Sequence, residues 1–408
     1  MINKTVMCID GGLFGSWALR LAKEYKRVLH FRPWTRSFSH PNDYIISSGY
    51  PQVERIEHFW DHIEECDTFC FLDIHFPDWA DYLRDQGKAV WSAFHGEELE
   101  LYRAETKALL KKVGLPVGKY VVLNGMDELR EHLEKHDDQI VKISKLRGLT
   151  ETFESERYDL IKIKLDDIEH KLGGLADSQE FVVEEKIEAI TESGFDGICI
   201  QGQFPKTSVV GYEIKDSGCA SKVTPYNLLP KEVRETNDKL SGTLKNFGYQ
   251  GFFSTEIRVT EDSYFPIDFT CRAASPAGES LQELFSNIGE VIEAGAHSEI
   301  VEPIAQHKYA AQAMIKSEFA AESWLPIYIP KKARDRFKLY HAARVDGQEF
   351  IVPTGIDMAE IGSVVGVGNS IDEAIKDCEK LAKQIEGYQI KVNTDALHEA
   401  KEELEKAA

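Results

Sequence analysis

Acidic and basic side chains alternate at strand spacing in the stretch GFFSTEIRVTEDSYFPIDFTCRAASPAGE. Glu256 and Arg258 stand two residues apart, so on extended backbone both side chains point to one face. Asp268, Thr270 and Arg272 repeat that spacing. Carboxylate oxygens are hard ligands for Mg²⁺, and a neighbouring guanidinium can bind an anionic oxygen. The stretch fits a metal and phosphate site, and it equally fits a half-buried hairpin with a polar outer face.

A second group of cations follows a predicted strand at residues 139–144, which carries Lys142. The loop KLRGLT comes next and includes Lys145, Arg147 and Gly148. Backbone amides and cations in such a loop can close over phosphates. A solvated hairpin loop would have the same composition, so the residues alone leave both interpretations open.

Strands and turns must position these side chains. TEDS at residues 260–263 is typical of a hairpin turn with a strand on either side. Residues 197–203 and 209–214 predict further strands of an antiparallel sheet. The further strands predicted after residue 100 lie at residues 119–123, 181–187, 197–203, 209–214, 310–315, 344–345 and 362–367.

Helices are predicted where apolar residues recur with helical periodicity. The last of them begins with Ser370 and Glu373, the spacing at which each side chain can bond the other's free amide. Residues 394–408 form a charged helix or a frayed tail. The predicted helices cover residues 16–25, 97–113, 126–135, 280–294 and 370–385.

The chain begins with an apolar strand at residues 4–10, a glycine-rich turn and a helix. The turn, GGLFG, lacks the full GxGxxG pattern of dinucleotide-binding loops, so nucleotide binding and tight packing of helix on strand both remain open. The further strands that predict an open α/β domain here lie at residues 27–30, 68–73 and 89–92.

Composition narrows the classes of function. The 408 residues are 42% hydrophobic, enough for two or three domains with buried cores. The formal net charge of −21 argues against nucleic acid or an anionic membrane as the main partner. Seven cysteines without CxxC spacing predict reduced thiols, and no apolar run approaches the ~20 residues of a membrane span. We therefore expect a soluble, cytoplasmic protein.

In order along the chain, these pieces resemble the ATP-grasp superfamily of carboxylate-amine ligases. The resemblance is strongest to phosphoribosylamine-glycine ligase and to the biotin carboxylase branch, and it covers nearly the whole chain. The segments that carry it are ETKALLKKVGLPVGKYVVL, DDQIVKISKLRG, EFVVEEKIEAITESGFDGICI, GFFSTEIRVTEDSYFPIDFTCRAASP and IGSVVGVGNSIDEAIKDCEKLAKQI.

The resemblance implies a multi-domain protein of α/β and α+β class. Residues 1–100 would form a Rossmann-like domain, and residues 101–305 the ATP-grasp core, whose two ATP-clamping subdomains divide near residue 185. Residues 306–408 would form a small C-terminal α+β domain like that of the glycine ligase. Homodimers are common in this branch, and the resemblance says no more than that about assembly.

The resemblance also implies a site for ATP with Mg²⁺ or Mn²⁺. Lys107 and Lys142 match the two ATP lysines, and Lys145, Arg147 and Gly148 match the loop over the phosphates. The residues that match the adenine hinge and the ribose contact are Glu184, Glu185, Lys186, Ile187 and Glu192, with Glu185 or Glu192 on the ribose.

Glu256, Asp268 and Thr270 match the family's metal-binding strands. Arg272 matches the cation that faces the transferred phosphoryl group, and Lys215 falls where the family places another phosphate-binding residue. The implied reaction is attack of a small-molecule carboxylate, an amino acid among the candidates, on the γ-phosphate to give an acyl phosphate and ADP. An amine then displaces phosphate to give an amide, without a protein nucleophile.

Three departures from the family pattern keep alternatives open. The family has Glu-x-Asn where this chain has Asp268 and Thr270, which are a shorter and a weaker ligand, so a catalytically inactive ATP-binding relative remains possible. The segments GGLFGSW and SGCASKVTPYNLLP also differ from the glycine ligase, which argues against a role in purine synthesis. An NAD-type oxidoreductase is a third hypothesis, but the second predicted strand ends in Arg32 instead of an acidic residue.

Overall fold

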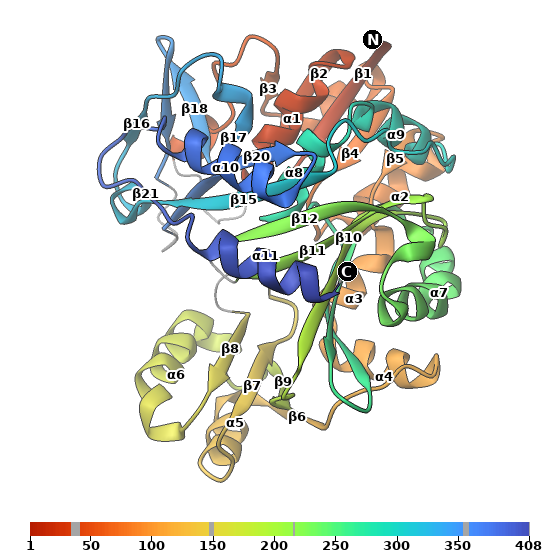
Figure 1. The fold of residues 1–408 in the computed structure, drawn as a ribbon, viewed down its shortest axis with the longest axis vertical. Helices are drawn as coiled ribbons and strands as arrows, with labels where there is room; N and C mark the ends of the chain where they lie inside the picture. The colour runs from red at the N-terminus through yellow and green to blue at the C-terminus, as the bar shows by residue number, and fades with distance from the viewer. Residues whose placement is uncertain (34–40, 147–150, 215–216, 354–358, 408) are drawn as a thin grey trace. The chain divides into compact units, whose positions relative to one another are not determined.

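The structure, a computed structural model, describes residues 1–33, 41–146, 151–214, 217–353 and 359–407 (Figure 1). The chain divides into two compact units. The large unit comprises Met1–Gly96, Ser193–Thr255 and Thr270–Ala408, and the small unit comprises Glu97–Glu192 and Glu256–Phe269. The mixture of parallel and antiparallel sheets confirms the predicted α/β and α+β class. The predicted three-part division at residues 100 and 305 stays a prediction.

A parallel sheet with the strand order β3-β2-β1-β4-β5 forms the N-terminal part of the large unit. The predicted glycine turn follows β1. In this turn a side chain at Gly12 (φ 107°) would come within 2.9 Å of Arg32 Nε and 3.0 Å of His341 Nδ1, so close packing requires the glycine. The elements are β1 Ile2–Ile9, α1 Gly15–Leu21, β2 Tyr25–Phe31, β3 Glu54–Ile56, β4 Thr68–Phe71, α2 Pro77–Asp85 and β5 Ala89–Trp91.

Both faces of this sheet are buried, which explains the apolar runs in β1, β2, β4 and β5. Val6 and Cys8 of β1 join the core cluster that includes Trp17 of α1. Met7 and Ile9, which alternate with them, join a second cluster that includes Leu83 of α2. The sheet therefore has helices on both faces, as the sequence predicted.

An antiparallel sheet with the order β13-β10-β11-β12-β15-β20-β17 forms the rest of the large unit, and β21 pairs with β15. A separate sheet has the order β16-β19-β18. Residues 191–192 of β10 and 256–259 of β13, with most of β14, belong to the small unit. The elements are β10 Thr191–Ile200, β11 Thr207–Ile214, β12 Gly218–Pro225, α7 Lys231–Asn246, β13 Gln250–Val259, β14 Tyr264–Thr270, α8 Ala277–Leu284, α9 Ile288–Ala296, β15 Tyr309–Lys316, β16 Leu325–Ile327, β17 Phe337–Leu339, β18 Ala342–Val345, β19 Gln348–Ile351, β20 Glu360–Gly368, α10 Ile371–Ala382, β21 Lys391–Val392 and α11 Ala396–Ala407.

The helix predicted at residues 280–294 is two helices, α8 and α9, because the chain between them pairs like a strand. Phe285 forms a bridge with Ala305, and the side chain of Asn287 accepts a hydrogen bond from the Ile304 amide at 2.8 Å. Asn287 Nδ2 also donates to the Glu302 carbonyl at 3.1 Å. The Ser286 amide, which a continuous helix would bond internally, donates instead to the Ile304 carbonyl at 3.0 Å.

The two C-terminal helices follow the sequence signals more closely. Ser370 caps α10 by accepting a hydrogen bond from the Glu373 amide, and the Glu373 side chain accepts from the Asn369 amide. The charged segment after it forms the helix α11, with Leu397 and Leu404 buried. Because α11 packs on β11 and β12, it covers the sheet and is not a frayed tail.

The small unit is built on a sheet with the order β6-β9-β7-β8. The hairpin of β13 and β14 turns at Thr260, whose amide donates to the Ser263 carbonyl at 2.8 Å, as predicted. Leu129, Val141 and Leu165 belong to the core cluster of the sheet and the helices α5 and α6. The remaining elements are α3 Glu98–Leu101, α4 Arg103–Lys112, β6 Tyr120–Asn124, α5 Gly125–Leu133, β7 Gln139–Ile143, β8 Thr152–Ser155, α6 Tyr158–Leu172 and β9 Glu180–Glu185.

The predicted helix at residues 97–113 is interrupted at Tyr102, which leaves helical geometry (φ −99°, ψ 77°). The Leu101 carbonyl instead accepts a hydrogen bond from the Lys145 amide at 2.7 Å. The Thr106 hydroxyl donates to the Leu99 carbonyl at 3.1 Å. Hydrogen-bond donors from elsewhere therefore satisfy the carbonyls that lose their helical partners at the break.

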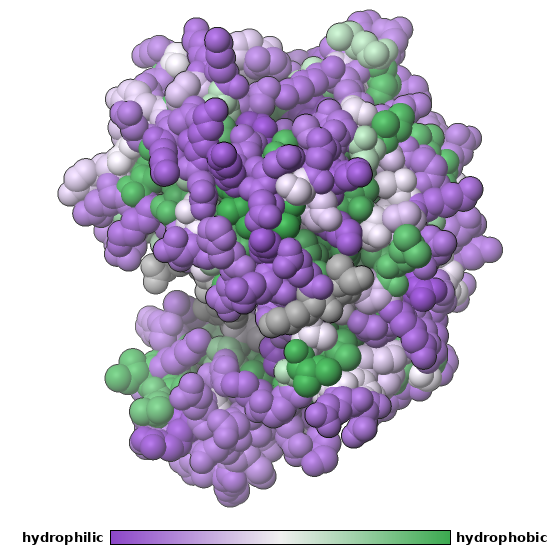
Figure 2. Space-filling view, viewed as in Figure 1, coloured by the Kyte–Doolittle hydropathy of each residue, from purple (hydrophilic) through white to green (hydrophobic). Residues whose placement is uncertain are grey.

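Hydrophilic side chains cover most of the face in Figure 2, in keeping with the net charge of −21. Small apolar patches interrupt this surface, and Leu160 and Ile163 make α6 one of them. Among the described residues, no helix has both the length and the apolar character needed to cross a membrane.

Candidate functional site

Two lysines converge on one carboxylate inside the small unit. Lys107 on α4 donates a hydrogen bond from Nζ to Glu184 Oε2 at 2.8 Å, and Lys142 Nζ lies 3.5 Å from Glu184 Oε1. The register of β7 and β9 explains the second contact, because Ile140 lies opposite Glu184 and Lys142 follows on the same face. Each of the three charged residues is only 5% exposed. The structure thus brings together both predicted ATP lysines and the first residue of the predicted hinge.

The charges of this cluster determine its protonation. Burial acts to raise the pKa of Glu184, but Lys142 and Lys107 lower it overall. Burial lowers the pKa of Lys107, against the influence of Glu184, and the nearby Lys142 adds to the decrease. Glu184 Oε1 has no hydrogen-bond partner within the described ranges. Crowded cations beside a buried, unsatisfied acceptor are typical of a functional site.

Asp268, predicted as a metal ligand, lies beside the same cluster. Its Oδ2 is 4.0 Å from Lys142 Nζ, and its Oδ1 accepts a hydrogen bond from Arg103 Nη1 at 3.3 Å. Lys142 Nζ also donates to the carbonyl of Ile267. Burial acts to raise the pKa of Asp268, but Lys142 and Arg103 lower it overall. The β14 strand therefore presents an ionised carboxylate to the lysine cluster.

Arg103 was not singled out by the sequence analysis. It begins α4 directly after the break, is 5% exposed, and has its Nη2 3.6 Å from Glu151 Oε2. Its Nε and Nη2 are buried and make no hydrogen bond to any residue that the structure describes. The usable signal was its position four residues before Lys107, which places both cations on one helix face. Arg103 adds unused donors to the cluster.

Glu256 and Arg258 extend from β13 at the predicted strand spacing. Arg258 Nε donates to Glu192 Oε1 at 2.7 Å, so the glutamate predicted for ribose is paired with the hairpin. The Glu256 side chain is exposed. In the described part of the chain, no group of three or more His, Cys, Asp or Glu side chains could hold a metal ion. Two carboxylates still fit Mg²⁺, which proteins commonly hold with one or two carboxylates plus phosphate oxygens.

The other predicted hinge residues lie at the end of β9. Glu185 and Lys186 are exposed and pair with Lys119, at 3.1 Å, and with Glu154. Their backbone amides donate to the carbonyls of Lys119 at 3.1 Å and Asp138 at 3.4 Å. Ile187 follows the strand and is partly buried. Alternation along β9 therefore points Glu184 toward the lysines and Glu185 away from them.

The remaining predicted residues are divided between the units and the undescribed segments. Lys145 is exposed and has left-handed backbone geometry (φ 66°). Arg147, Gly148 and Lys215 lie outside the described residues. The large unit contains Thr270, at the end of β14, and the partly exposed Arg272, whose Nη1 donates to the Ala273 carbonyl at 3.2 Å.

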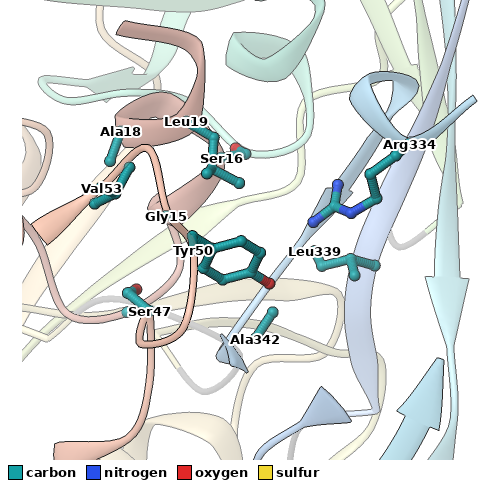
Figure 3. Close-up of a pocket in the computed structure, with 11 residues that line it drawn as sticks. Gly15, Ser16, Ala18, Leu19, Ser47, Tyr50, Val53, Arg334, Leu339 and Ala342 are labelled. Carbon is teal, nitrogen blue, oxygen red and sulfur yellow. The ribbon is translucent and has the colours of Figure 1, made fainter. Parts of the chain in front are cut away.

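A pocket in the large unit was not predicted from the sequence (Figure 3). Two of its polar side chains share one partner, Glu349. Tyr50 OH donates to Glu349 Oε1 at 2.9 Å, and Arg334 Nε donates to Glu349 Oε2 at 2.6 Å. We therefore interpret it as a seam between N-terminal and C-terminal segments of this unit. The lining residues are Gly12, Gly15, Ser16, Ala18, Leu19, Ser47, Tyr50, Val53, Arg334, Leu339 and Ala342.

Solved structures share this fold. Phosphoribosylamine-glycine ligase from Thermotoga maritima superposes with a TM-score of 0.72 and 14% identity, over 96% of this chain and 99% of that one. The biotin carboxylase domain of Hydrogenobacter thermophilus 2-oxoglutarate carboxylase superposes with a TM-score of 0.67 and 13% identity, over 97% of this chain and 93% of that one. L-amino acid ligase from Bacillus licheniformis superposes with a TM-score of 0.62 and 14% identity, over 95% of this chain and 99% of that one. No protein-family model and no curated protein matches the sequence. The predicted likeness in fold to phosphoribosylamine-glycine ligase and to biotin carboxylase is thereby confirmed.

Proposed function

We propose that the chain is an ATP-dependent ligase that activates a carboxylate as an acyl phosphate and joins it to an amine. The products would be an amide, ADP and phosphate. The observation that carries this proposal is the buried cluster of Lys107, Lys142 and Glu184, with Asp268 and Arg103 beside it. Such a group of cations and an ionised carboxylate is suited to phosphoryl transfer, where catalysis consists of positioning and of neutralising charge on oxygen.

In this proposal Lys107, Lys142 and Arg103 bind phosphate oxygens, because their donors converge where burial strengthens each interaction. Lys145, Arg147 and Gly148 close over the phosphates. Adenosine lies along the hinge formed by Glu184, Glu185, Lys186 and Ile187, with Glu185 or Glu192 on the ribose. The remaining proposed roles are Mg²⁺ or Mn²⁺ binding by Glu256, Asp268 and Thr270, and stabilisation of the transferred phosphoryl group by Arg272 and Lys215.

Bound ATP and Mg²⁺ would supply the phosphoryl group and neutralise its charge. The side chains of this chain would hold the phosphates in line with the substrate carboxylate and exclude water from the acyl phosphate. Solved structures with this fold support the cofactors, since the Hydrogenobacter domain was crystallised with MgADP, ADP and bicarbonate. An N5-carboxyaminoimidazole ribonucleotide synthetase of the same fold was crystallised with ADP.

The proposed substrates are a small-molecule carboxylate and an amine. An amino acid is a reasonable carboxylate, because one protein with this fold is an L-amino acid ligase. A cytoplasmic location is consistent with the reduced thiols expected from the seven cysteines, all of which are buried. The Hydrogenobacter domain forms a dimer, and a homodimer is the assembly that we would test first here.

Incubation with ATP, Mg²⁺ and a panel of amino acids tests the activity. We expect ADP and phosphate to be released in equal amounts, and only when an amino acid is present. The measurement is coupled ADP detection together with mass spectrometry of the amide. ADP release that does not depend on any carboxylate, or its complete absence with a broad panel of acids, would contradict the proposal.

The alternative is an inactive relative that binds ATP without turnover. It is favoured by Asp268, which is shorter than the glutamate usual in the family, and by Thr270, which is a weaker hard ligand than the usual asparagine. Isothermal calorimetry distinguishes the two, because the inactive relative would bind ATP with no product formed under any condition.

Thr270→Asn is expected to lower the Mg²⁺ concentration needed for half-maximal activity by about 3- to 10-fold, because an amide oxygen is a better hard ligand than a hydroxyl. The measurement is ADP release against Mg²⁺ concentration at saturating ATP. Thr260→Asn, a matched change in the hairpin turn, should not change the Mg²⁺ concentration needed for half-maximal activity. An unchanged Mg²⁺ requirement in Thr270→Asn would remove Thr270 from the proposed metal ligands.

A further inference from the structure

A chain of hydrogen-bonded side chains runs into the core of the large unit from the segment that carries Arg272. Ser275 Oγ and Tyr340 OH are 2.5 Å apart, and Tyr340 OH donates to Glu279 Oε1 at 2.9 Å. Gln312 Nε2 donates to Glu279 Oε2 at 3.0 Å. The residues come from the loop before α8, from α8 itself, from β15 and from the segment after β17. Elements distant in sequence thus converge on one carboxyl group.

Glu279 is the unusual member of this chain. It is 1% exposed, and its hydrogen-bond partners among the described residues are all uncharged. A buried carboxyl group without a cation is costly to keep. Burial raises its pKa to about 7, although Gln312, Tyr340 and Ser275 oppose the shift. Such a group can accept and release a proton near neutral pH.

The rest of the network fixes the orientation of Glu279. Gln312 Nε2 also donates to Ser363 Oγ at 2.9 Å, and Ser280 Oγ donates to Gln312 Oε1 at 2.8 Å. The amide of Gln312 therefore bonds to Glu279, Ser363 and Ser280 at once. Glu279 keeps one oxygen for Gln312 and the other for Tyr340.

Ser275 is the outer end of the chain of hydroxyls. It is partly exposed and lies three residues after the partly exposed Arg272. Between them Ala273 is buried, and its amide donates to the Leu72 carbonyl at 3.1 Å. The segment is therefore anchored between Arg272 and Ser275, both of which are partly exposed.

We propose that Ser275, Tyr340 and Glu279 form a proton relay that deprotonates the incoming amine. This inference rests on the proposed ligase function. An ammonium group gives a proton to Ser275 Oγ while the Ser275 proton passes to Tyr340 and the Tyr340 proton passes to the Glu279 carboxylate. The free amine then attacks the acyl phosphate, so that a C–N bond forms and the C–O bond to phosphate breaks. The second amine proton leaves with the phosphate, and Glu279 returns its own proton to solvent.

The relay has a defined pH dependence. Tyr340 and Cys219, whose Sγ contacts Gln312 Oε1 at 4.0 Å, are titratable groups in contact with the network. Burial raises the pKa of both far above neutrality, so of these three groups only Glu279 titrates near pH 7. Amide formation should rise with pH through about 7, because only ionised Glu279 accepts the proton.

Hydroxylamine distinguishes loss of the relay from loss of acyl phosphate formation. It is uncharged at neutral pH and therefore reacts directly with an acyl phosphate to give a hydroxamate. We expect Tyr340→Phe and Glu279→Gln to lower amide formation with an amino-acid amine by about 10²-fold. Both variants should form hydroxamate nearly as fast as the parent protein. The dependence of amide formation on Glu279 ionisation should disappear in Glu279→Gln.

Tyr249→Phe is the matched control, since it removes a buried tyrosine hydroxyl that donates to the Phe252 carbonyl and lies outside the network of Glu279. It should change neither reaction. Parallel loss of hydroxamate and amide in the relay variants would mean a structural role and overturn the relay, as would unchanged amide formation. If the parent protein forms neither product with any carboxylate, the ligase proposal itself fails and the relay fails with it.

Discussion

Lys142→Met is expected to reduce ATP turnover by about 10²- to 10³-fold, because it removes a preorganised cation from developing phosphate charge. In the small unit this one ammonium group lies between Glu184 and Asp268. Its loss leaves two carboxylates facing each other with less compensation, and breaking a buried ion pair in this way costs about 3–5 kcal/mol. The measurements are ADP release, calorimetric ATP binding and thermal unfolding.

Two further variants distinguish the effect of losing the positive charge from an effect on folding. Lys142→Arg keeps the positive charge and should recover part of the ATP affinity. Lys119→Met makes the same chemical change at an exposed lysine paired with Glu185, where an ion pair contributes little to stability. Turnover in Lys142→Met equal to that of Lys119→Met would show that the buried cluster has no part in the reaction.

Asp268→Asn is expected to reduce turnover by about 10³-fold while leaving metal-free nucleotide binding in place. The carboxylate charge is lost where Mg²⁺ needs it, whereas Lys107 and Lys142 remain to bind phosphates. The variant should require more Mg²⁺ than the parent protein, and calorimetry with and without Mg²⁺ measures the difference.

The control for Asp268→Asn is Asp262→Asn, the same change at an exposed position in the turn of the same hairpin. It should behave like the parent protein. The variant also distinguishes the two proposed functions, because an inactive ATP-binding relative would show no turnover in parent or variant. Full turnover in Asp268→Asn would exclude this residue as a metal ligand.

Part of the site could be predicted because each of its motifs is local in sequence. The resemblance identified Lys142 and Glu184, and strand alternation explains why Lys142 lies on the same face as Ile140, which pairs with Glu184. The hairpin turn at Thr260 follows from its own residues. Arg103 escaped prediction because the helix break before it depends on a distant partner, the amide of Lys145. Helical periodicity predicts which residues share a helix face. It carries no information about which backbone carbonyl will accept a hydrogen bond from another segment.

The polar network of Glu279 could not have been predicted in the same way. Glu279 and Gln312 look like ordinary polar positions of a helix and a strand, and only the fold brings Tyr340 between Ser275 and Glu279. The break between α8 and α9 has the same origin, because Asn287 bonds to a segment that follows much later. In each case the sequence could not identify the distant residue that forms the hydrogen bond in the folded structure.

The division of the large unit into three chain segments has a consequence for how the protein reaches its native state. Val6 near one end of the chain and Val365 near the other belong to a single core cluster. Contacts of such large sequence separation form slowly, because chain ends must meet before burial rewards the encounter. The small unit draws most of its residues from one continuous stretch. Nucleation therefore belongs to the small unit, and completion of the large unit sets the rate of folding.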